Sequence, residues 1–146
     1  MQISYNGIQL LKKEEGFREE AYQDSGGVWT IGFGSTSIDG KPVEPGMVLS
    51  EAEADDEMRK FLAGVQTTIN HYVKVPITQN MFDALCSFIY NIGIGAFLRS
   101  TMLKLLNAGL YQAAANQFAR WRYDNGVEIP GLVNRRKREK ELFLRK

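Results

Sequence analysis

Two carboxylates and a hydroxyl follow one another at short intervals near the start of the chain. Glu15 is followed nine residues later by Asp24, and Thr30 lies six residues beyond that. Hydrolysis of a glycosidic bond needs an acid that protonates the leaving oxygen and a second carboxylate on the other face of the sugar. A hydroxyl that both donates and accepts hydrogen bonds can hold the attacking water. We therefore assign Glu15 as general acid, Asp24 as general base or electrostatic stabiliser, and Thr30 as the water-positioning residue.

Each of these residues also has a purely structural interpretation. A Glu before a Gly is common at a helix end, Asp is a frequent turn residue, and Thr is favoured in strands. The chain has 17 acidic residues, so a carboxylate pair alone is a weak signal. The functional interpretation depends on what the rest of the chain adds.

The first helix is expected over residues 3–15. Ile8, Leu11 and Glu15 share one helical face, which favours Glu15 over Glu14 weakly, and Gly16 is a typical helix stop. The negative end of the helix dipole, together with apolar neighbours, favours the protonated form that an acid needs.

After Gly16 the pattern changes to short β-prone runs separated by turns, up to residue 40. Ser25-Gly26-Gly27 and Asp39-Gly40 are turn signals, and residues 28–31 are β-prone. We expect a small antiparallel sheet of about two or three strands. Residues 42–47 are expected to form a loop.

The remainder of the chain is predicted to be mostly helical. Ser50 and Glu53 form a capping box that starts a long helix ending near Tyr72. The further expected elements are a helix over 78–92, a bend at 93–95, helices over 100–107 and 111–121, a loop over 122–130 and a final helix over 132–144.

Together these elements predict an α+β fold with a single domain spanning 1–146. A β-containing lobe would cover about 16–58, and a helical lobe about 1–15 plus 74–146. The helix over about 51–72 would link them, with the active-site cleft between the lobes.

Composition excludes several other classes of protein. The net charge of +1 gives no general reason to expect nucleic-acid binding. No membrane-spanning apolar run or signal-peptide pattern is present. The single cysteine, Cys86, cannot form an internal disulfide and is expected to be a buried apolar residue, while His71 is expected to face solvent. No cluster of His and Cys suggests a metal, so no cofactor is expected.

Several segments in the same order along the chain resemble the phage lysozyme family (endolysins, glycoside hydrolase family 24). They are EG…AYQDSGGVWTIGFG, QNMFDALCSFIYNIG, GAFLRST and GLVNRRKREKELF. The resemblance covers nearly the whole chain, and the endolysins of temperate enteric phages are most alike. It implies a lysozyme-like fold and hydrolysis of the β-1,4 bond between N-acetylmuramic acid and N-acetylglucosamine in peptidoglycan, with inversion at the anomeric carbon.

The resemblance also implies roles for individual residues. The family's general acid, second carboxylate and water-positioning threonine match Glu15, Asp24 and Thr30. An arginine that pairs with the catalytic Glu matches Arg135, and this cation would favour the ionised form of Glu15, in opposition to the helix end.

Candidate substrate-binding residues follow from the same resemblance. Asn91 and Ser100 match positions that hydrogen-bond saccharide, and Tyr90 matches an aromatic residue lining the cleft, although core packing explains Tyr90 equally well. The family commonly has a histidine after the second glycine of the TIGxG run, whereas here Gly34 is followed by Ser35. A salt bridge through that histidine is therefore in question, and Ser35 is kept as a substrate-binding candidate.

The expected biology is that of a monomeric endolysin made in the host cytoplasm. It would reach the periplasm and cell wall after a holin forms a pore. Three alternatives stay open: a lytic transglycosylase, a non-catalytic wall-binding module, and a helical nucleic-acid-binding protein that uses the basic C-terminal helix.

Overall fold

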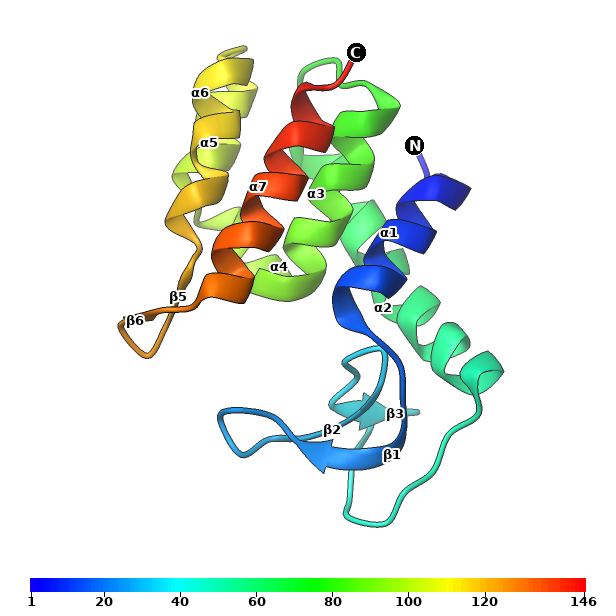
Figure 1. The fold of residues 1–146 in the computed structure, drawn as a ribbon. Helices are drawn as coiled ribbons and strands as arrows, with labels where there is room; N and C mark the ends of the chain where they lie inside the picture. Colours follow the sequence, from blue (N-terminus) through cyan, green and yellow to red (C-terminus); the bar gives the residue numbers. More distant parts are fainter. The chain divides into compact units, whose positions relative to one another are not determined.

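The computed structural model describes residues 1–146 and resolves two compact units. The helical unit comprises Met1–Ile8 and Gly64–Lys146, and the β-containing unit comprises Gln9–Ala63. The division falls within two helices, α1 (Tyr5–Glu15) and α2 (Glu51–Tyr72) (Figure 1). The predicted division into two lobes and a linking helix stays a prediction.

The β-containing unit holds two short hairpins. Strand β1 (Arg18–Gln23) pairs antiparallel with β2 (Trp29–Gly32), and β3 (Ser37–Ile38) pairs with β4 (Lys41–Pro42). These form two separate two-stranded sheets, whereas a single sheet was expected. The chain turns back directly after β2, where Ile31 and Ser35 exchange backbone hydrogen bonds of 2.9 Å, so β3 starts a new hairpin instead of extending the first.

The core of this unit is formed by apolar side chains from α1, the hairpins and α2. Its buried members are Leu11, Ile31, Phe33, Val43, Leu49, Ala54, Met58 and Leu62. Burying one such large side chain contributes about 1.5–3 kcal/mol to stability. Gly32 is required for this packing, because a methyl group there would lie 2.9 Å from Cβ of Ala54 and its φ is +65°.

The start of α2 confirms the predicted capping box. The Glu53 amide donates to the Ser50 hydroxyl at 3.1 Å, and the Ser50 amide donates to the Glu53 carboxylate at 3.1 Å. The two bonds satisfy amides that a helix start otherwise leaves unpaired, which fixes where α2 begins.

The helical unit is built around two helices that run side by side, α3 (Gln79–Ile92) and α7 (Pro130–Leu144) (Figure 1). Helix α3 is buried from Phe82 to Ile89. The elements between them are α4 (Ile94–Leu98), α5 (Thr101–Asn107), α6 (Tyr111–Asn116), the 3₁₀ helix η1 (Phe118–Arg120), β5 (Tyr123–Asp124) and β6 (Val127–Glu128).

Aromatic rings form much of the interior of the helical unit. Phe88 and Phe118 lie edge to face with centroids 5.0 Å apart, and Phe118 and Phe143 are 5.6 Å apart. Such pairs add about 0.5–1.5 kcal/mol beyond the area they bury. Phe118 is fully buried among these rings, and the expected burial of Cys86 is confirmed.

Three local predictions in this unit are wrong. A bend was expected over 93–95, but helix α4 already begins at Ile94, because the chain restarts a helix directly after Gly93, whose φ of +95° ends α3. The helix expected over 111–121 ends at Asn116, and η1 follows. Residues 123–128 form a hairpin where a loop was expected.

The mixture of helices with small antiparallel sheets confirms the α+β class. No helix combines the length and the apolar character needed to cross a membrane.

Candidate active site

Glu15 is the last residue of α1 and is partly buried. The helix ends there because Gly16 adopts a φ of +68° while its amide still donates to the Lys12 carbonyl at 2.9 Å. The backbone of Gly34 lies close to the Glu15 carboxyl: a methyl group at Gly34 would be 3.2 Å from Oε1 of Glu15. A glycine is thus needed where the chain leaving β2 passes this carboxyl.

Asp24 lies in the turn between β1 and β2 and is exposed to solvent. Its Oδ1 accepts hydrogen bonds of 2.9 Å from the amides of Gly26 and Val28. The backbone of Asp24 also exchanges bonds with Val28 and Gly27. The side chain therefore has a structural role as an Asx-type turn former, and the turn in return holds the carboxylate in one position.

Thr30 lies on β2 opposite Tyr22 and is 5% exposed. Its hydroxyl donates to the carbonyl of Val28 at 3.0 Å. That bond uses the hydroxyl proton and leaves oxygen lone pairs able to accept a hydrogen bond. Val28 therefore contacts both residues, accepting from Thr30 and donating to Asp24.

The structure places Glu15, Asp24 and Thr30 in the same compact unit, on the end of one helix and on the adjoining hairpin. Ser35 belongs to this unit too, and its backbone closes the turn after β2 through its bonds with Ile31. The catalytic and substrate-binding roles of these four residues stay predictions.

The other candidates lie in the helical unit. Tyr90 is half-buried near the end of α3. Asn91 is exposed, and its side-chain oxygen accepts a 2.7 Å bond from Arg136. Ser100 is buried and caps α5: its hydroxyl donates to the Phe97 carbonyl at 2.6 Å and accepts from the Leu103 amide at 3.2 Å. Their predicted contacts with saccharide stay predictions.

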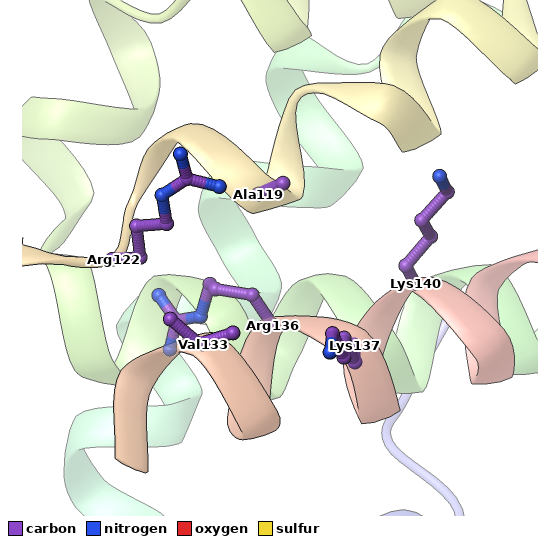
Figure 2. Close-up of a pocket in the computed structure, with 6 residues that line it drawn as sticks. All are labelled: Ala119, Arg122, Val133, Arg136, Lys137 and Lys140. Carbon is purple, nitrogen blue, oxygen red and sulfur yellow. The ribbon is translucent and has the colours of Figure 1, made fainter. Parts of the chain in front are cut away.

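A pocket of about 200 Å³ in the helical unit contains none of the predicted site residues. Figure 2 shows it between the segment around η1, which carries Arg122, and the face of α7 that carries Arg136. Its lining consists of Ala119, Arg122, Val133, Arg136, Lys137 and Lys140.

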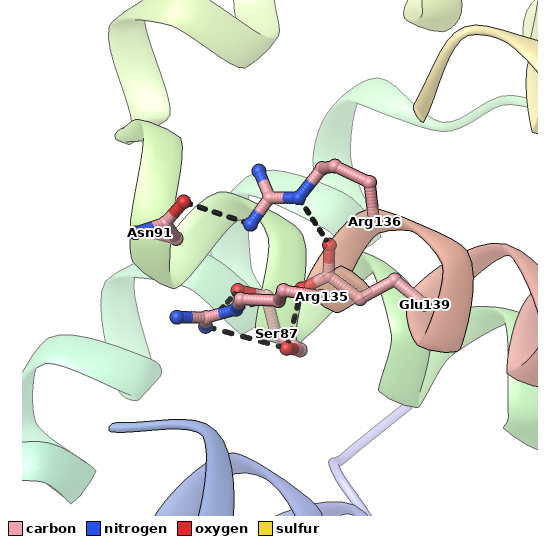
Figure 3. A network of polar contacts seen from close by, with 5 residues as sticks. All are labelled: Ser87, Asn91, Arg135, Arg136 and Glu139. Atoms are coloured by element: carbon pink, nitrogen blue, oxygen red, sulfur yellow. Dashed lines mark hydrogen bonds and ion pairs between the residues drawn. The ribbon is translucent and has the colours of Figure 1, made fainter. Parts of the chain in front are cut away.

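Arg135 takes part in a buried network between α7 and α3 (Figure 3). Its guanidinium donates to the Ser87 carbonyl at 3.0 Å and lies 3.2 Å from Oε2 of Glu139. Arg136 lies 2.8 Å from Oε1 of the same Glu139. One carboxylate is thus shared by two arginines, and the Ser87 hydroxyl donates to it at 2.6 Å.

Burial raises the pKa of the Glu139 carboxyl, while the guanidiniums of Arg136 and Arg135 act in the opposite direction. All three charged residues are at most 6% exposed. Contacts with Ser87 and Glu139 fix the position of Arg135. The pairing of Arg135 with Glu15 stays a prediction.

Two features of this region were not identified from the sequence. They are the close approach of Gly34 to the Glu15 carboxyl and the position of Glu139 between Arg135 and Arg136. The signal for Glu139 was its spacing of four and three residues from Arg135 and Arg136, which places all three on adjoining positions of one helix.

No three His, Cys, Asp or Glu side chains lie close enough together to hold a metal ion. Cys86 is buried, and burial raises the pKa of its thiol. His71 is exposed at the end of α2, as expected.

The chain is similar in sequence to known phage lysozymes. The family model for phage lysozyme matches residues 12–139. The endolysin of Salmonella phage P22 is 47% identical over 145 residues, which is 99% of each chain.

Solved structures confirm the lysozyme-like fold. An endolysin from Escherichia coli O157:H7 phage FAHEc1 superposes with a TM-score of 0.91 at 41% identity, covering 99% of this chain and 94% of its own. The muramidase domain of SpmX from Asticaccaulis excentricus gives a TM-score of 0.89 at 38% identity, with 99% of each chain covered. The chain belongs to the phage lysozyme family.

Proposed function

We propose that this lysozyme is a muramidase that cuts the β-1,4 bond between N-acetylmuramic acid and N-acetylglucosamine by inverting general acid/base catalysis. Membership of the phage lysozyme family makes the chain an enzyme that hydrolyses peptidoglycan in host lysis. We propose in addition which bond is cut, the inversion at the anomeric carbon and the roles of the individual residues.

In the proposed reaction, Glu15 protonates the leaving glycosidic oxygen. Thr30 holds a water molecule, and Asp24 removes its proton or stabilises the positive charge that develops on the sugar ring. The water attacks the face of the anomeric carbon opposite the leaving group. An inverting arrangement requires a separation of about 6.5–9.5 Å between the two carboxyl groups, so that the water fits between them.

The observation that carries this proposal is the joint placement of the three side chains within the β-containing unit. Glu15 is positioned by the end of α1 and by Gly34. Asp24 and Thr30 are positioned by the β1–β2 hairpin, through Val28. Fixed donors and acceptors of this kind reduce the reorganisation needed during the reaction.

The remaining candidates have supporting roles in the proposal. Arg135 would support Glu15 electrostatically, and Ser35, Tyr90, Asn91 and Ser100 would contact the saccharide. Action as a monomer after release through a holin pore, from the host cytoplasm to the wall, is proposed with it.

The acid assignment is tested by Glu15→Gln, which keeps the size and hydrogen-bonding capacity of the side chain but cannot give up a proton as a carboxyl does. General acid catalysis contributes on the order of 10²–10⁴-fold, so clearing of a suspension of purified peptidoglycan should slow by at least about 10²-fold. The matched control is Glu14→Gln, the neighbouring carboxylate on α1.

Circular dichroism should show both variants folded. Equal loss in the two variants, or rapid clearing by Glu15→Gln, would exclude Glu15 as the acid.

A further inference from the structure

The pocket beside α7 has a strongly cationic lining. Four of its six lining residues are Arg or Lys, and no carboxylate is among them. Val133, Arg136, Lys137 and Lys140 lie at helical spacings of three, one and three residues, which places them on one face of α7. Arg122 approaches from the segment after η1 (Figure 2).

Two of these cations are already fixed by the fold. Arg136 is 1% exposed, lies 2.8 Å from Glu139 and donates to Asn91 at 2.7 Å. Arg122 lies 3.4 Å from Glu128, at the base of the β5–β6 hairpin. Arg136 therefore requires little ordering when a ligand enters, whereas Arg122 forms a partly exposed ion pair at the edge of the pocket.

The two lysines differ from the arginines in this respect. Neither Lys137 nor Lys140 forms an ion pair with a carboxylate in the protein; Lys137 is exposed and Lys140 is half-buried. Lys137 and Lys140 are three residues apart on α7, and like charges at neighbouring helix positions are mildly unfavourable. An anion at the pocket would remove this repulsion.

The lining also has an apolar component. Ala119 and Val133 contribute methyl groups, and the Lys and Arg side chains contribute aliphatic stems below their charged ends. An inorganic anion would leave these apolar surfaces unused. A phosphate ester, with an anionic end and a carbon-bearing end, matches both parts of the lining.

We infer that this pocket binds the phosphate group of a small phosphate ester. Guanidinium and ammonium groups are the usual protein ligands of phosphate, which accepts several charge-assisted hydrogen bonds at once. A phosphate carries more negative charge than a carboxylate, so a lining with four basic side chains favours it over a carboxylate. None of the proposed catalytic residues lines this pocket, and its existence does not depend on the proposed reaction.

The test is isothermal titration calorimetry of the intact protein with glycerol 3-phosphate at constant ionic strength. Constant ionic strength is necessary because exposed charges are screened by salt. Saturable binding with one site per chain is expected, weakened at least tenfold in the double variant Lys137→Ala/Lys140→Ala. The matched control, Lys13→Ala/Lys104→Ala, removes two exposed lysines outside the pocket and should bind as the unmodified protein does.

Two further titrations define the ligand class. Acetate at the same ionic strength should bind at least tenfold more weakly than glycerol 3-phosphate. Inorganic phosphate should bind, but more weakly than the ester, if the apolar lining is used; equal binding would assign the site to phosphate alone and still support it.

The inference is overturned if no saturable binding occurs, if the control double variant loses as much affinity as the pocket variant, or if acetate binds equally well. Backbone amide shifts measured by NMR would locate the site independently. On saturation with glycerol 3-phosphate, the largest changes should occur around residues 119–122 and 133–140, and changes confined to other segments would also overturn it.

Discussion

At the scale of single residues, the proposed active site depends on close contacts between side chains and backbone. Gly34 passes so near Glu15 that any side chain would meet the carboxyl, and Asp24 and Thr30 both bond to Val28. These contacts mean that the same atoms have structural and proposed catalytic roles. A substitution that preserves the structural contacts but removes the proposed catalytic group can separate the two roles.

Gly34→Ala should displace the Glu15 carboxyl. The new methyl group would lie 3.2 Å from Oε1, and the φ of +82° adds backbone strain. Misplacement of a catalytic group can cost on the order of 10- to 100-fold in rate, so we expect a loss of kcat in that range with the fold retained.

Gly46→Ala is the matched control for this substitution. Gly46 has a similar φ of +86°, and a methyl group there would meet nothing within 4 Å. It should lose stability comparably, by roughly 1–2 kcal/mol, without the loss of kcat. Equal kcat values for the two variants would show that Gly34 does not position Glu15.

Asp24→Asn and Asp24→Ala separate the turn-forming role of Asp24 from its charge. The Asn oxygen can still accept the bonds from Gly26 and Val28, whereas Ala cannot. We expect both variants to lose at least about 10²-fold in peptidoglycan turnover, with only Ala also lowering the thermal midpoint. Near-normal turnover by Asp24→Asn would remove Asp24 from the catalytic scheme.

At the scale of secondary structure, long elements with a local sequence signal were predicted well from the sequence, whereas short elements were not. The capping box at Ser50 and the periodic apolar face of α3 determined long helices that appear almost where they were expected. The short elements could not be predicted from the periodicity of apolar residues. Asn125 and Gly126, with φ of +50° and +78°, close the β5–β6 hairpin, and this Asn-Gly signal was assigned to a loop.

Prediction of the candidate site was limited in a similar way, because contacts between residues far apart in the sequence could not be identified. The spacing of Glu15, Asp24 and Thr30 was readable because all three lie close together in the sequence. The neighbours of Arg135 on α3, such as Ser87, lie 48 residues away in the sequence, so only the packing of α3 against α7 reveals them. Asn91 and Ser100 were assigned to sugar binding, yet their visible bonds connect them to Arg136 and to the start of α5.

The pairing of α3 with α7 makes Glu139 the most sensitive polar position. Glu139→Gln would remove the carboxylate that Arg135 and Arg136 share in this buried network. Loss of one partner from a buried ion pair costs about 3–5 kcal/mol, and we expect that decrease in the free energy of unfolding by urea.

Glu141→Gln serves as the control on the same helix, because Glu141 is exposed. Its effect should stay within about 0.5 kcal/mol. Similar values for the two substitutions would mean that the network does not stabilise α7.

At the scale of the whole molecule, pH should affect stability through Asp55. Its carboxylate lies 2.7 Å from Lys12 and 2.7 Å from Arg59, and so connects α1 with α2. Burial raises the pKa of this carboxyl, but the hydrogen bonds and charges of Lys12 and Arg59 outweigh it and hold the pKa below its usual range. A carboxyl of this kind stabilises the fold above its unfolded-state pKa and loses that contribution as pH falls through the folded-state value.

The stability difference between the unmodified protein and Asp55→Asn should therefore be fully present at neutral pH and shrink as the pH falls below about 4. Asp56→Asn, at the exposed neighbouring position, should show little difference at any pH. Urea unfolding across this range measures both. A difference for Asp55→Asn that stays constant down to low pH would contradict its pairing with Lys12 and Arg59.

The central claim is hydrolysis of the bond after N-acetylmuramic acid, and the products of that reaction test it most directly. Purified peptidoglycan should be digested to completion in ¹⁸O-labelled water, and the soluble fragments analysed by mass spectrometry. The proposed reaction predicts fragments that end in reducing N-acetylmuramic acid carrying one ¹⁸O atom, and none of them from the Glu15→Gln variant. Fragments ending in unlabelled anhydro-muramic acid would instead identify a lytic transglycosylase and contradict the hydrolytic mechanism.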